Sequence, residues 1–383
     1  MSDFIRDRLT WIAYLLVAWF AYLQAAPGLV IPHLREELDL SYSTAGLHVT
    51  AFAAGSMLAG LVSPWLERAL GRRTVLWSAV AVLSAAAIAL TAGRTATVTV
   101  ASVLIMGIGG GVVLTTVQAA LADHHGVRRA VALAEANVAA SVAYVILIGL
   151  LTLTASLHIG WRIAVLASLI VPALTWWGNR RLAIDAAPVS GAAQGRLPGV
   201  FWIAAAMLFC TTAAEWCISA WGATFVQEAA GVAADTAVLL MAGFYGGVLV
   251  GRVVGSRLAR RRDPAQLLGA ALAIAAAGFA VLWPSTGAAQ AVVGLSLLGI
   301  GLGNLFPMAL SVLVGLVPEQ AVLASGRAVT ISAFAVVLLP LTVGALADAT
   351  SLKAALTVVP VILALAAVAL VLVRRPAYSR SRL

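Results

Sequence analysis

Charged residues are scarce in this chain of 383 residues, since Asp, Glu, Lys and Arg together make up only 10% of it. A soluble globular domain carries about 25% charged residues. The hydrophobic share is 62%, which is more apolar surface than a soluble fold could bury, so a soluble protein is excluded. Cysteine is scarce too. Cys210 and Cys217 lie in one apolar run, where they act as small hydrophobes and imply no disulfide framework.

Signatures of enzymes and of nucleotide-driven pumps are also missing. The sequence offers no phosphate-binding loop, no room for a nucleotide-binding domain, and no nucleophile and base whose proximity it could establish. We therefore expect neither enzyme activity nor a cofactor. Asp123-His124-His125 is expected to be a solvated loop that binds no metal. The formal charge of +9 comes from basic residues in short loops, which favours membrane orientation over a nucleic-acid partner.

The chain does contain a series of uninterrupted apolar runs. At about 1.5 Å rise per residue, a helix of about 20 residues crosses a ~30 Å hydrocarbon core. The runs predict an all-α membrane protein with twelve transmembrane helices in two six-helix bundles, and the first run is expected to be a retained helix rather than a signal peptide. The predicted spans are 11–31, 42–65, 74–92, 97–121, 130–153, 161–177, 200–226, 236–258, 265–283, 289–316, 328–349 and 354–373.

Basic residues divide unequally between alternate loops. One set of loops, which includes both termini, holds 19 Lys and Arg, the other set holds four, and Arg252 lies within a span. We therefore expect a protein of the inner (plasma) membrane, and the positive-inside rule predicts that both of its termini lie in the cytoplasm. The stretch from Ala183 to Gly199 is the only long polar connection. It predicts an N-terminal bundle over 1–178, a cytoplasmic linker over 179–199, and a C-terminal bundle with a short tail over 200–383.

The two halves of the sequence match each other at an offset of 191 or 192 residues. The matches are Trp11-Ile-Ala13 with Trp202-Ile-Ala204, Gly55 to Gly60 with Gly246 to Gly251, and Gly107 to Gly111 with Gly299 to Gly303. Their common order indicates a duplication. Because each half has six helices, corresponding helices cross in the same direction. This predicts parallel repeats, a substrate site between the halves near the midplane, and alternating access.

The chain resembles the major facilitator superfamily over essentially its whole length. The local marks are Leu66-Glu-Arg-Ala-Leu-Gly-Arg-Arg73, which is similar to a cytoplasmic loop motif of the family, and Gly160-Trp-Arg162. The resemblance implies a gating loop made of Glu67, Arg68, Gly71, Arg72 and Arg73. The family usually has an acidic residue three positions before the glycine, where this chain has Arg68. The sequence therefore leaves open whether this chain forms the family's gating salt bridge.

A narrower resemblance is to the fucose-permease-like branch of that family. It rests on Glu215-Trp216 with Trp221, on Gly247 to Arg252, and on Gly301 to Pro307. By analogy it implies a proton-coupled importer of a sugar-like solute.

Glu215 is the most informative residue of the sequence, because it stands near the middle of its span with no cation within one helical turn. A carboxylate at that depth is costly unless it is paired, protonated or facing water. Glu215 is therefore the predicted proton-coupling site, with a structural hydrogen-bond donor as the alternative. Gln24 lies 191 positions earlier, at the same depth of the first half. It is predicted to contact substrate, or else to bond helices together.

Several other polar residues each have two interpretations. Arg252, where the first half has Leu61, either pairs with Glu215 or an anionic substrate, or extends to the interface. Glu135 and Asn137 either form a gate or proton exit that contacts solute, or Glu135 forms an interfacial ion pair with a loop arginine.

The remaining candidates lie in the second half and in the second helix. Asn304, among helix-loosening Gly and Pro residues, contacts either substrate or a neighbouring helix. Trp216 and Tyr245 either stack on a sugar ring or pack. His48, one or two turns into its helix, could titrate, although its place near the outer surface predicts that it is solvated.

Together these features predict a secondary transporter that moves a small solute with protons, by symport of a sugar-like or other small polar substrate, and that works as a monomer in the lipid bilayer. One rival is a drug/proton antiporter. Such antiporters usually have a Gly-Pro motif in helix 5 and an arginine in helix 4, where this chain has Val103. A rival of another class is a membrane receptor, scaffold or enzyme that transports nothing.

Overall fold

The structure is a computed structural model that describes residues 5–182, 184, 195–259 and 261–374. Within these ranges it is helical, with no strand. Its α-helices are α1 (Arg8–Leu38), α2 (Tyr42–Leu70), α3 (Arg72–Ala92), α4 (Ala96–His125), α5 (Arg129–Ser156), α6 (Trp161–Ala167), α7 (Ile170–Asn179), α8 (Gly199–Ala230), α9 (Ala234–Leu258), α10 (Pro264–Leu282), α11 (Ala288–Gly315), α12 (Ala321–Ala349), α13 (Leu352–Ala355) and α14 (Val358–Arg374). Two short 3-10 helices, η1 (Gly126–Arg128) and η2 (Pro318–Gln320), complete them.

The prediction of twelve spans is confirmed, because twelve helical stretches of the described chain are long and apolar enough to cross a membrane. Their boundaries differ in places from the apolar runs. The sixth span contains a break between α6 and α7 at Ser168 and Leu169, and the last contains α13 and α14. Helix α1 continues through Pro27 and Pro32 to Leu38, well past the predicted end at residue 31.

Short polar side chains set where several helices begin. Asp7, Thr95 and Asp263 each accept a hydrogen bond from the backbone N–H three residues later, at α1, α4 and α10 respectively. Such caps satisfy one of the backbone donors that a helix start leaves without an intrahelical partner. Helix α8 ends at Gly231 in the left-handed conformation, which glycine adopts without strain.

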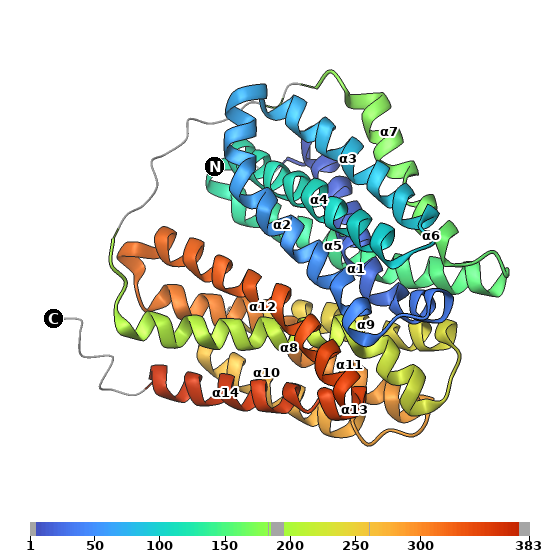
Figure 1. Ribbon diagram of the computed structural model, residues 1–383. Helices are drawn as coiled ribbons and strands as arrows, with labels where there is room; N and C mark the ends of the chain where they lie inside the picture. Colours follow the sequence, from blue (N-terminus) through green and yellow to red (C-terminus); the bar gives the residue numbers. More distant parts are fainter. Residues whose placement is uncertain (1–4, 183, 185–194, 260, 375–383) are drawn as a thin grey trace. The chain divides into compact units, whose positions relative to one another are not determined.

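The chain forms two compact units. Unit 1 consists of residues 1–40 and 47–189, and unit 2 of residues 41–46 and 190–383. In unit 1, α1 packs on α4 and α5, and α3 packs on α4 (Figure 1). In unit 2, α11 packs on α8, α9 and α10, and α8 packs on α12 and α14. Much of the predicted linker over 179–199 lies outside the described residues, so the predicted domain boundaries stay a prediction.

Glycines bring a corresponding pair of helices into contact in each unit, α2 with α4 in unit 1 and α9 with α11 in unit 2. At four of them an added Cβ would overlap a backbone carbonyl oxygen of the facing helix, so the helices touch backbone to backbone. The contacts are Gly55 on Leu104 and Gly107 on Phe52 in unit 1, and Gly247 on Ser296 and Gly299 on Phe244 in unit 2. Each residue of the second set lies 192 positions after its counterpart. The α2–α4 packing is therefore repeated by α9 and α11 in the same chain direction, as parallel repeats require.

This packing also corrects the register of the repeat in α2 and α9. The offset of 191 pairs Gly55 with Gly246, but a Cβ on Gly246 would meet open space, whereas Gly247 makes the close contact. The counterpart of Arg252 is therefore Gly60 rather than Leu61. The sequence match was wrong by one residue because glycines follow one another at this point, and only the facing helix distinguishes them.

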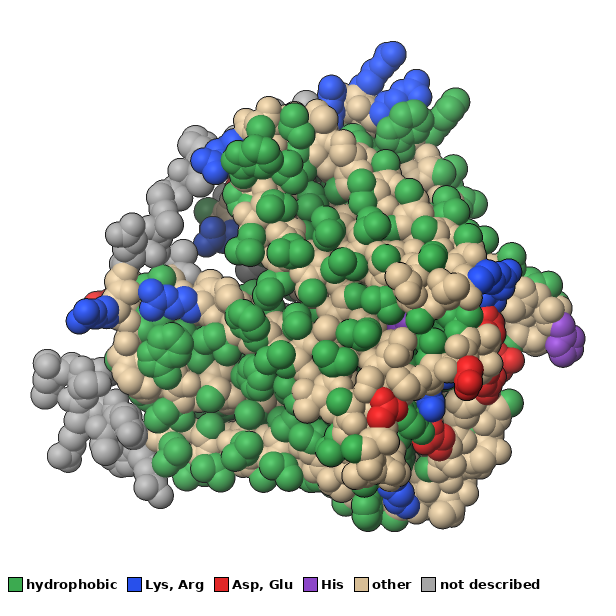
Figure 2. Space-filling view, in the orientation of Figure 1, with side chains coloured by type: hydrophobic (Ala, Val, Ile, Leu, Met, Phe, Trp, Pro, Cys, Tyr) green, Lys and Arg blue, Asp and Glu red, His purple; other side chains and the backbone are tan. Residues whose placement is uncertain are grey.

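Large apolar side chains remain exposed along the helices of both units. Leu61, Leu174 and Trp177 are among the most exposed of the described ones. Figure 2 shows hydrophobic side chains spread over the visible face, with charged side chains gathered toward its margins. An exposed apolar surface interrupted by so little charge is the surface that a lipid-embedded protein presents.

Candidate functional site

Glu215 in α8 forms an ion pair with Arg252 in α9. The distance between Oε1 of Glu215 and Nη2 of Arg252 is 3.6 Å, and the two side chains are 19% and 33% exposed. Glu215 lies near the middle of α8, so the pair is far from both ends of that helix. This contact matches the interpretation in which Arg252 pairs with Glu215, and the predicted contact of Arg252 with substrate stays a prediction. The nearest cation to the carboxylate thus comes from a neighbouring helix, which spacing along α8 could not reveal.

Arg252 and Asn304 fasten α9 to α11 in a reciprocal way. Nε of Arg252 donates to the carbonyl oxygen of Gly303 at 3.4 Å. The side-chain amide of Asn304 donates to the carbonyl oxygen of Gly251. A Cβ at Gly255 would overlap the Asn304 amide, so a glycine is needed for this approach. Asn304 therefore makes the helix-packing contact, and its predicted contact with substrate remains untested.

The aromatic candidates of unit 2 differ in their environments. Tyr245 is buried and its ring lies edge-on to Phe244, with 5.1 Å between ring centroids. Trp216, next to Glu215, is only half-buried. Burial of Tyr245 favours its packing interpretation, whereas the predicted contact of Trp216 with a solute stays a prediction.

Gln24 bonds to a second polar side chain in unit 1. The hydroxyl of Tyr144 in α5 donates to Oε1 of Gln24 in α1 at 3.3 Å. Gln24 is half-buried. The contact matches the helix-bonding interpretation of Gln24, and its predicted contact with substrate stays a prediction.

Glu135 forms the ion pair that was one of its two predicted roles. Arg6 donates to both carboxylate oxygens, from Nε at 2.8 Å and Nη2 at 2.6 Å. The hydroxyl of Tyr14 donates to the same carboxylate at 3.0 Å. Asn137 is exposed and donates to the carbonyl oxygen of Leu133 in its own helix. This arrangement ties α1 to α5 and gives Glu135 a structural partner.

The histidines at the end of α4 contact the start of α1. Nε2 of His124 lies 2.8 Å from Oδ2 of Asp7, and Nε2 of His125 lies 2.8 Å from the hydroxyl of Thr10. Burial acts to raise the pKa of Asp7, but hydrogen bonds from Thr10 and the nearby His124 outweigh it and hold that pKa below its usual range. No cluster of three metal-ligating side chains occurs in the described part of the chain.

His48 is buried, so the expectation that it is solvated is wrong. Its side chain is fully enclosed in unit 1, and Nε2 lies 2.9 Å from the hydroxyl of Thr99 in α4. The physical reason is the close packing of α2 on α4, which begins a few residues further along at Phe52 and Gly55.

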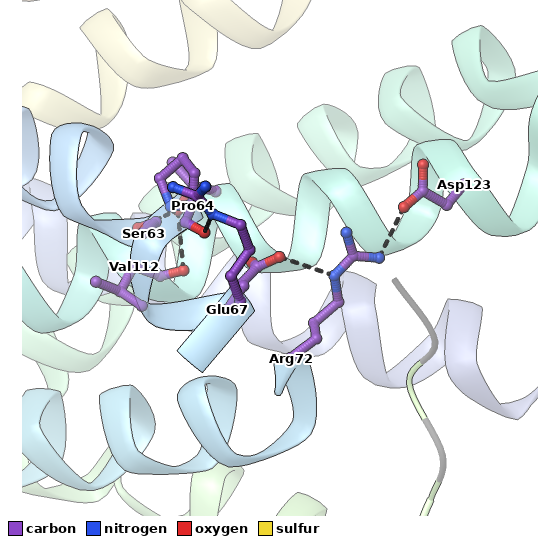
Figure 3. A network of polar contacts seen from close by, with 8 residues as sticks. Ser63, Pro64, Glu67, Arg72, Val112 and Asp123 are labelled. Carbon is purple, nitrogen blue, oxygen red and sulfur yellow. Dashed lines mark hydrogen bonds and ion pairs between the residues drawn. The ribbon is translucent and has the colours of Figure 1, made fainter. Parts of the chain in front are cut away.

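The predicted gating loop contains a buried arginine between two acids. Arg72, whose side chain is 6% exposed, donates to Glu67 at 3.1 Å and to Asp123 at 2.7 Å. Figure 3 shows it lying between these two carboxylates, which come from the ends of α2 and α4. Arg68 instead donates to the carbonyl oxygen of Pro64. Glu67, one position earlier than the family pattern, thus supplies the acid in a loop salt bridge.

The rest of the loop is more exposed. Gly71 adopts a positive φ of 78° between α2 and α3, which suits glycine. The side chain of Arg73 is exposed. Asp123 was expected to lie in a solvated loop, and its pairing with Arg72 was not predicted, because the two residues are 51 positions apart.

Comparison with known protein families identifies the chain. The model of the Major Facilitator Superfamily matches residues 10–321 and 204–382. The chain belongs to the Major Facilitator Superfamily. As a member of this superfamily it is a multi-pass membrane transporter of small molecules and not an enzyme, which confirms the family resemblance seen in its motifs. No curated protein sequence matches the chain, and the fucose-permease-like branch stays a prediction.

Solved structures of other superfamily transporters share the fold. They include a bacterial homologue of the human lysosomal transporter Spinster in an inward-facing, occupied conformation, with a TM-score of 0.79 at 15% identity over 97% of each chain. A D-xylose-proton symporter matches with a TM-score of 0.76 at 14% identity over 96% of each chain. A mutant of nucleoside transporter NupG matches at 0.74 and 12%, over 96% of this chain and 100% of that one. Identities this low establish the architecture and leave the substrate open.

Two acids of this superfamily member have roles that the sequence did not reveal. Glu37 accepts hydrogen bonds from the Trp161 indole and the Arg162 guanidinium, so the Gly160-Trp-Arg162 motif clamps α6 onto α1. Asp348, near the end of α12, accepts hydrogen bonds from the backbone N–H groups of Tyr42 at 2.7 Å and Ser43 at 2.8 Å. An acid near a helix C-terminus is disfavoured by the helix dipole. The position of Asp348 near a helix C-terminus was therefore the one sequence feature that could have indicated that it caps the start of another helix.

Replacing Asp348 with alanine should loosen the start of α2. The loss of a side-chain cap costs about 1 kcal/mol of helix stability, so we expect faster hydrogen exchange at the amides of Tyr42 and Ser43. Hydrogen exchange followed by mass spectrometry would measure this. Replacement of the exposed Glu319 is the control. Unchanged exchange in the Asp348→Ala variant would show that the cap has no energetic role.

Proposed function

We propose that this transporter couples the movement of a small polar solute to protons, as a symporter that works by alternating access with Glu215 as the proton site. The observation that carries the proposal is the Glu215–Arg252 ion pair near the middle of α8. Ionisable residues at membrane depth are costly and are usually retained for transport. The D-xylose-proton symporter among the proteins with this fold supports proton coupling by analogy.

Coupling requires an acid whose protonation changes the local interactions. When Glu215 is ionised, it balances the charge of Arg252. When it is protonated, the attraction is lost, and α8, α9 and α11 lose one of the contacts that join them. A proton can therefore bias the equilibrium between two arrangements of these helices. Glu135 is a weaker candidate, since its carboxylate is already held by Arg6 and Tyr14.

The proposal includes the orientation of the protein in the membrane. Both termini are placed in the cytoplasm of the inner (plasma) membrane, on the basis of the unequal distribution of basic residues. The sequence resemblance favours uptake of a sugar-like solute over drug efflux.

Glu215→Gln should abolish proton-driven uptake and leave exchange intact. In proteoliposomes, uptake of the transported solute under an inward proton gradient should fall to the level measured without a gradient, because glutamine cannot take up the proton. Counterflow exchange, which needs no net proton movement, should persist. Glu319→Gln, which changes an exposed acid, is the matched control. Gradient-driven uptake that survives in Glu215→Gln would remove this residue from the mechanism. Proton-driven efflux of a hydrophobic dye that Glu215→Gln abolishes would instead favour the drug/proton antiporter.

A further inference from the structure

We propose that the end of α7 binds the phosphate group of an anionic phospholipid. The surface that binds it consists of Arg8, at the start of α1, and of Trp176, Trp177, Arg180 and Arg181, at the end of α7. We name it the α7 surface. This binding is separate from the proposed proton coupling and does not depend on it.

The length of the sixth span places the α7 surface at the level of the lipid headgroups. The span runs from Trp161 to Asn179 and contains 19 residues. At about 1.5 Å per residue it is about 28 Å long, which is close to the ~30 Å thickness of the hydrocarbon core. Its two ends therefore lie at the two borders of that core, where tryptophan is enriched. Arg180 and Arg181 follow directly after one of these ends.

Two guanidinium groups are held in place at this end. Arg8 donates from Nε to Oδ1 of Asn179, which joins the start of α1 to the end of α7. Cζ of Arg180 lies 5.1 Å from the ring centroid of Trp176 and 5.4 Å from that of Trp177. The side chains of both arginines are exposed. A cation that is already held by aromatic rings loses less conformational freedom when it binds a ligand.

The opposite end of the same span shows a similar pair for which the protein supplies the anion. Cζ of Arg162 lies 4.7 Å from the ring centroid of Trp161. That ring is only 4% exposed, and the guanidinium donates to both carboxylate oxygens of Glu37. At the α7 surface, by contrast, Trp177 is 75% exposed. Within the described part of the chain, the Arg180 side chain has ring contacts but no hydrogen bond or ion pair.

The acids near the α7 surface do not neutralise it. Helix α7 packs on α1 and α3. Helix α3 contains no acid, and both acids of α1 lie in its last turn, far from Arg8. Asp7 precedes Arg8, but its carboxylate accepts a hydrogen bond from Thr10 and lies 2.8 Å from Nε2 of His124. The next acid after Arg181 in the sequence is Asp185, which lies outside the described residues.

Basic side chains also dominate this end of the molecule in the figures. Figure 2 shows Lys and Arg side chains projecting at the margin where α7 ends in Figure 1, with no acid visible among them. Positive charge at the border of the hydrocarbon core attracts anionic lipid headgroups. The helix dipole at the end of α7 also favours a cation, so the test must separate lipid binding from a role in the helix end alone.

An anionic phospholipid matches both the charged and the apolar parts of this helix. A guanidinium binds a phosphate group through parallel hydrogen bonds. Ile170, Leu174 and Trp177 are all exposed and follow one another at spacings of four and three residues, so they lie along one face of α7. An acyl chain would lie along this face while its headgroup reaches the arginines. A free phosphate ion would use the arginines and leave the apolar face uncovered.

The test uses purified full-length protein in a neutral detergent and two lipids with the same acyl chains. Native mass spectrometry would count the bound molecules of phosphatidylglycerol and of phosphatidylcholine, whose headgroup has no net charge, over a titration of each lipid. We expect the wild type to retain phosphatidylglycerol preferentially. Changing both Arg180→Gln and Arg181→Gln should weaken phosphatidylglycerol binding about thirtyfold, which is about fivefold for each basic residue at an anionic lipid surface.

The matched control removes the same charge from another loop. Arg261→Gln with Arg262→Gln changes two exposed arginines between α9 and α10 and should leave phosphatidylglycerol binding close to that of the wild type. Equal losses in the two double variants would mean that the attraction is spread over all basic loops, and would overturn the site. Equal retention of the two lipids by the wild type would overturn it as well, and the arginines would then serve the helix end only.

Two further measurements separate the source of the phosphate and the part of the rings. Inorganic phosphate at the concentration of the lipid should not displace phosphatidylglycerol, and displacement would mean that the site binds a free anion instead. Trp177→Leu, which keeps every charge, should weaken phosphatidylglycerol binding about twofold to fivefold, because one ring no longer holds the Arg180 guanidinium. Trp202→Leu, an exposed tryptophan of unit 2, should have no effect. Equal results for the two tryptophan variants would contradict the part assigned to the rings.

Discussion

The Gly247→Ala variant should be clearly destabilised, whereas the adjacent Gly246→Ala variant should not. A Cβ at position 247 would overlap the carbonyl oxygen of Ser296 and lie 3.0 Å from the backbone N of Ile300. Backbone atoms cannot turn aside as a side chain can, so α9 and α11 must separate. Overpacking costs about 1–3 kcal/mol, and the value here should lie at the upper end of that range because the overlap is with backbone atoms. Thermal unfolding in detergent would measure the loss.

Gly246→Ala is the matched control on the same helix. A Cβ at this position would meet no atom within 4 Å, and alanine is a better helix former than glycine by about 1 kcal/mol. Its melting temperature should therefore stay equal or rise. The repeat supplies an independent copy of the experiment, since Gly55→Ala should be destabilising and Gly60→Ala should not. Equal melting temperatures within either pair would contradict the backbone contact.

The Arg72→Met variant should be strongly destabilised because it leaves Glu67 and Asp123 without the guanidinium between them. Removal of one partner from a buried ion pair costs about 3–5 kcal/mol. The value here should lie near the lower limit, about 3 kcal/mol, because Asp123 is 34% exposed and partly screened by solvent. The melting temperature in detergent is the measurement, and Arg73→Met, which changes the exposed neighbour, is the control.

Removing both acids together with the arginine tests the cause. When Arg72→Met is combined with Glu67→Gln and Asp123→Asn, the two acids no longer carry charges that the guanidinium would have to balance, and most of the lost stability should return. If the triple variant is as unstable as Arg72→Met alone, the arginine stabilises the loop by packing its stem rather than through its charge.

Particular residues show how far the sequence could go. The transmembrane helices were predictable because a chain in lipid must satisfy its backbone hydrogen bonds within each segment, so apolar length alone marks a span. Glu215 was recognisable for a related reason, as an acid within such a span. Its partner Arg252 was visible as a candidate, but the sequence left two interpretations open, because a long side chain can point toward either end of its helix.

Contacts between helices were harder to predict. His48, Asp123 and Asp348 each have a partner on another helix, and the distance along the chain to that partner ranges from 51 to 306 residues. Nothing in the local pattern indicates which of many apolar helices will be the neighbour. The one-residue error in the register of α2 and α9 has the same origin, because Gly246 and Gly247 are equivalent until α11 faces one of them.

The sequence by itself determined that this protein lives in lipid, that it has twelve membrane-spanning segments, that it is a duplication, and that it carries an acid within its seventh span. Each follows from composition, run length or self-similarity, which need no knowledge of neighbours. Only the tertiary structure decided that Arg252 stands beside that acid, that Arg72 joins two acids at the loop, and that paired glycines bring helix backbones into contact. These depend on side chains and backbone atoms from distant segments meeting within a few ångströms, which is a property of packing and not of any one segment.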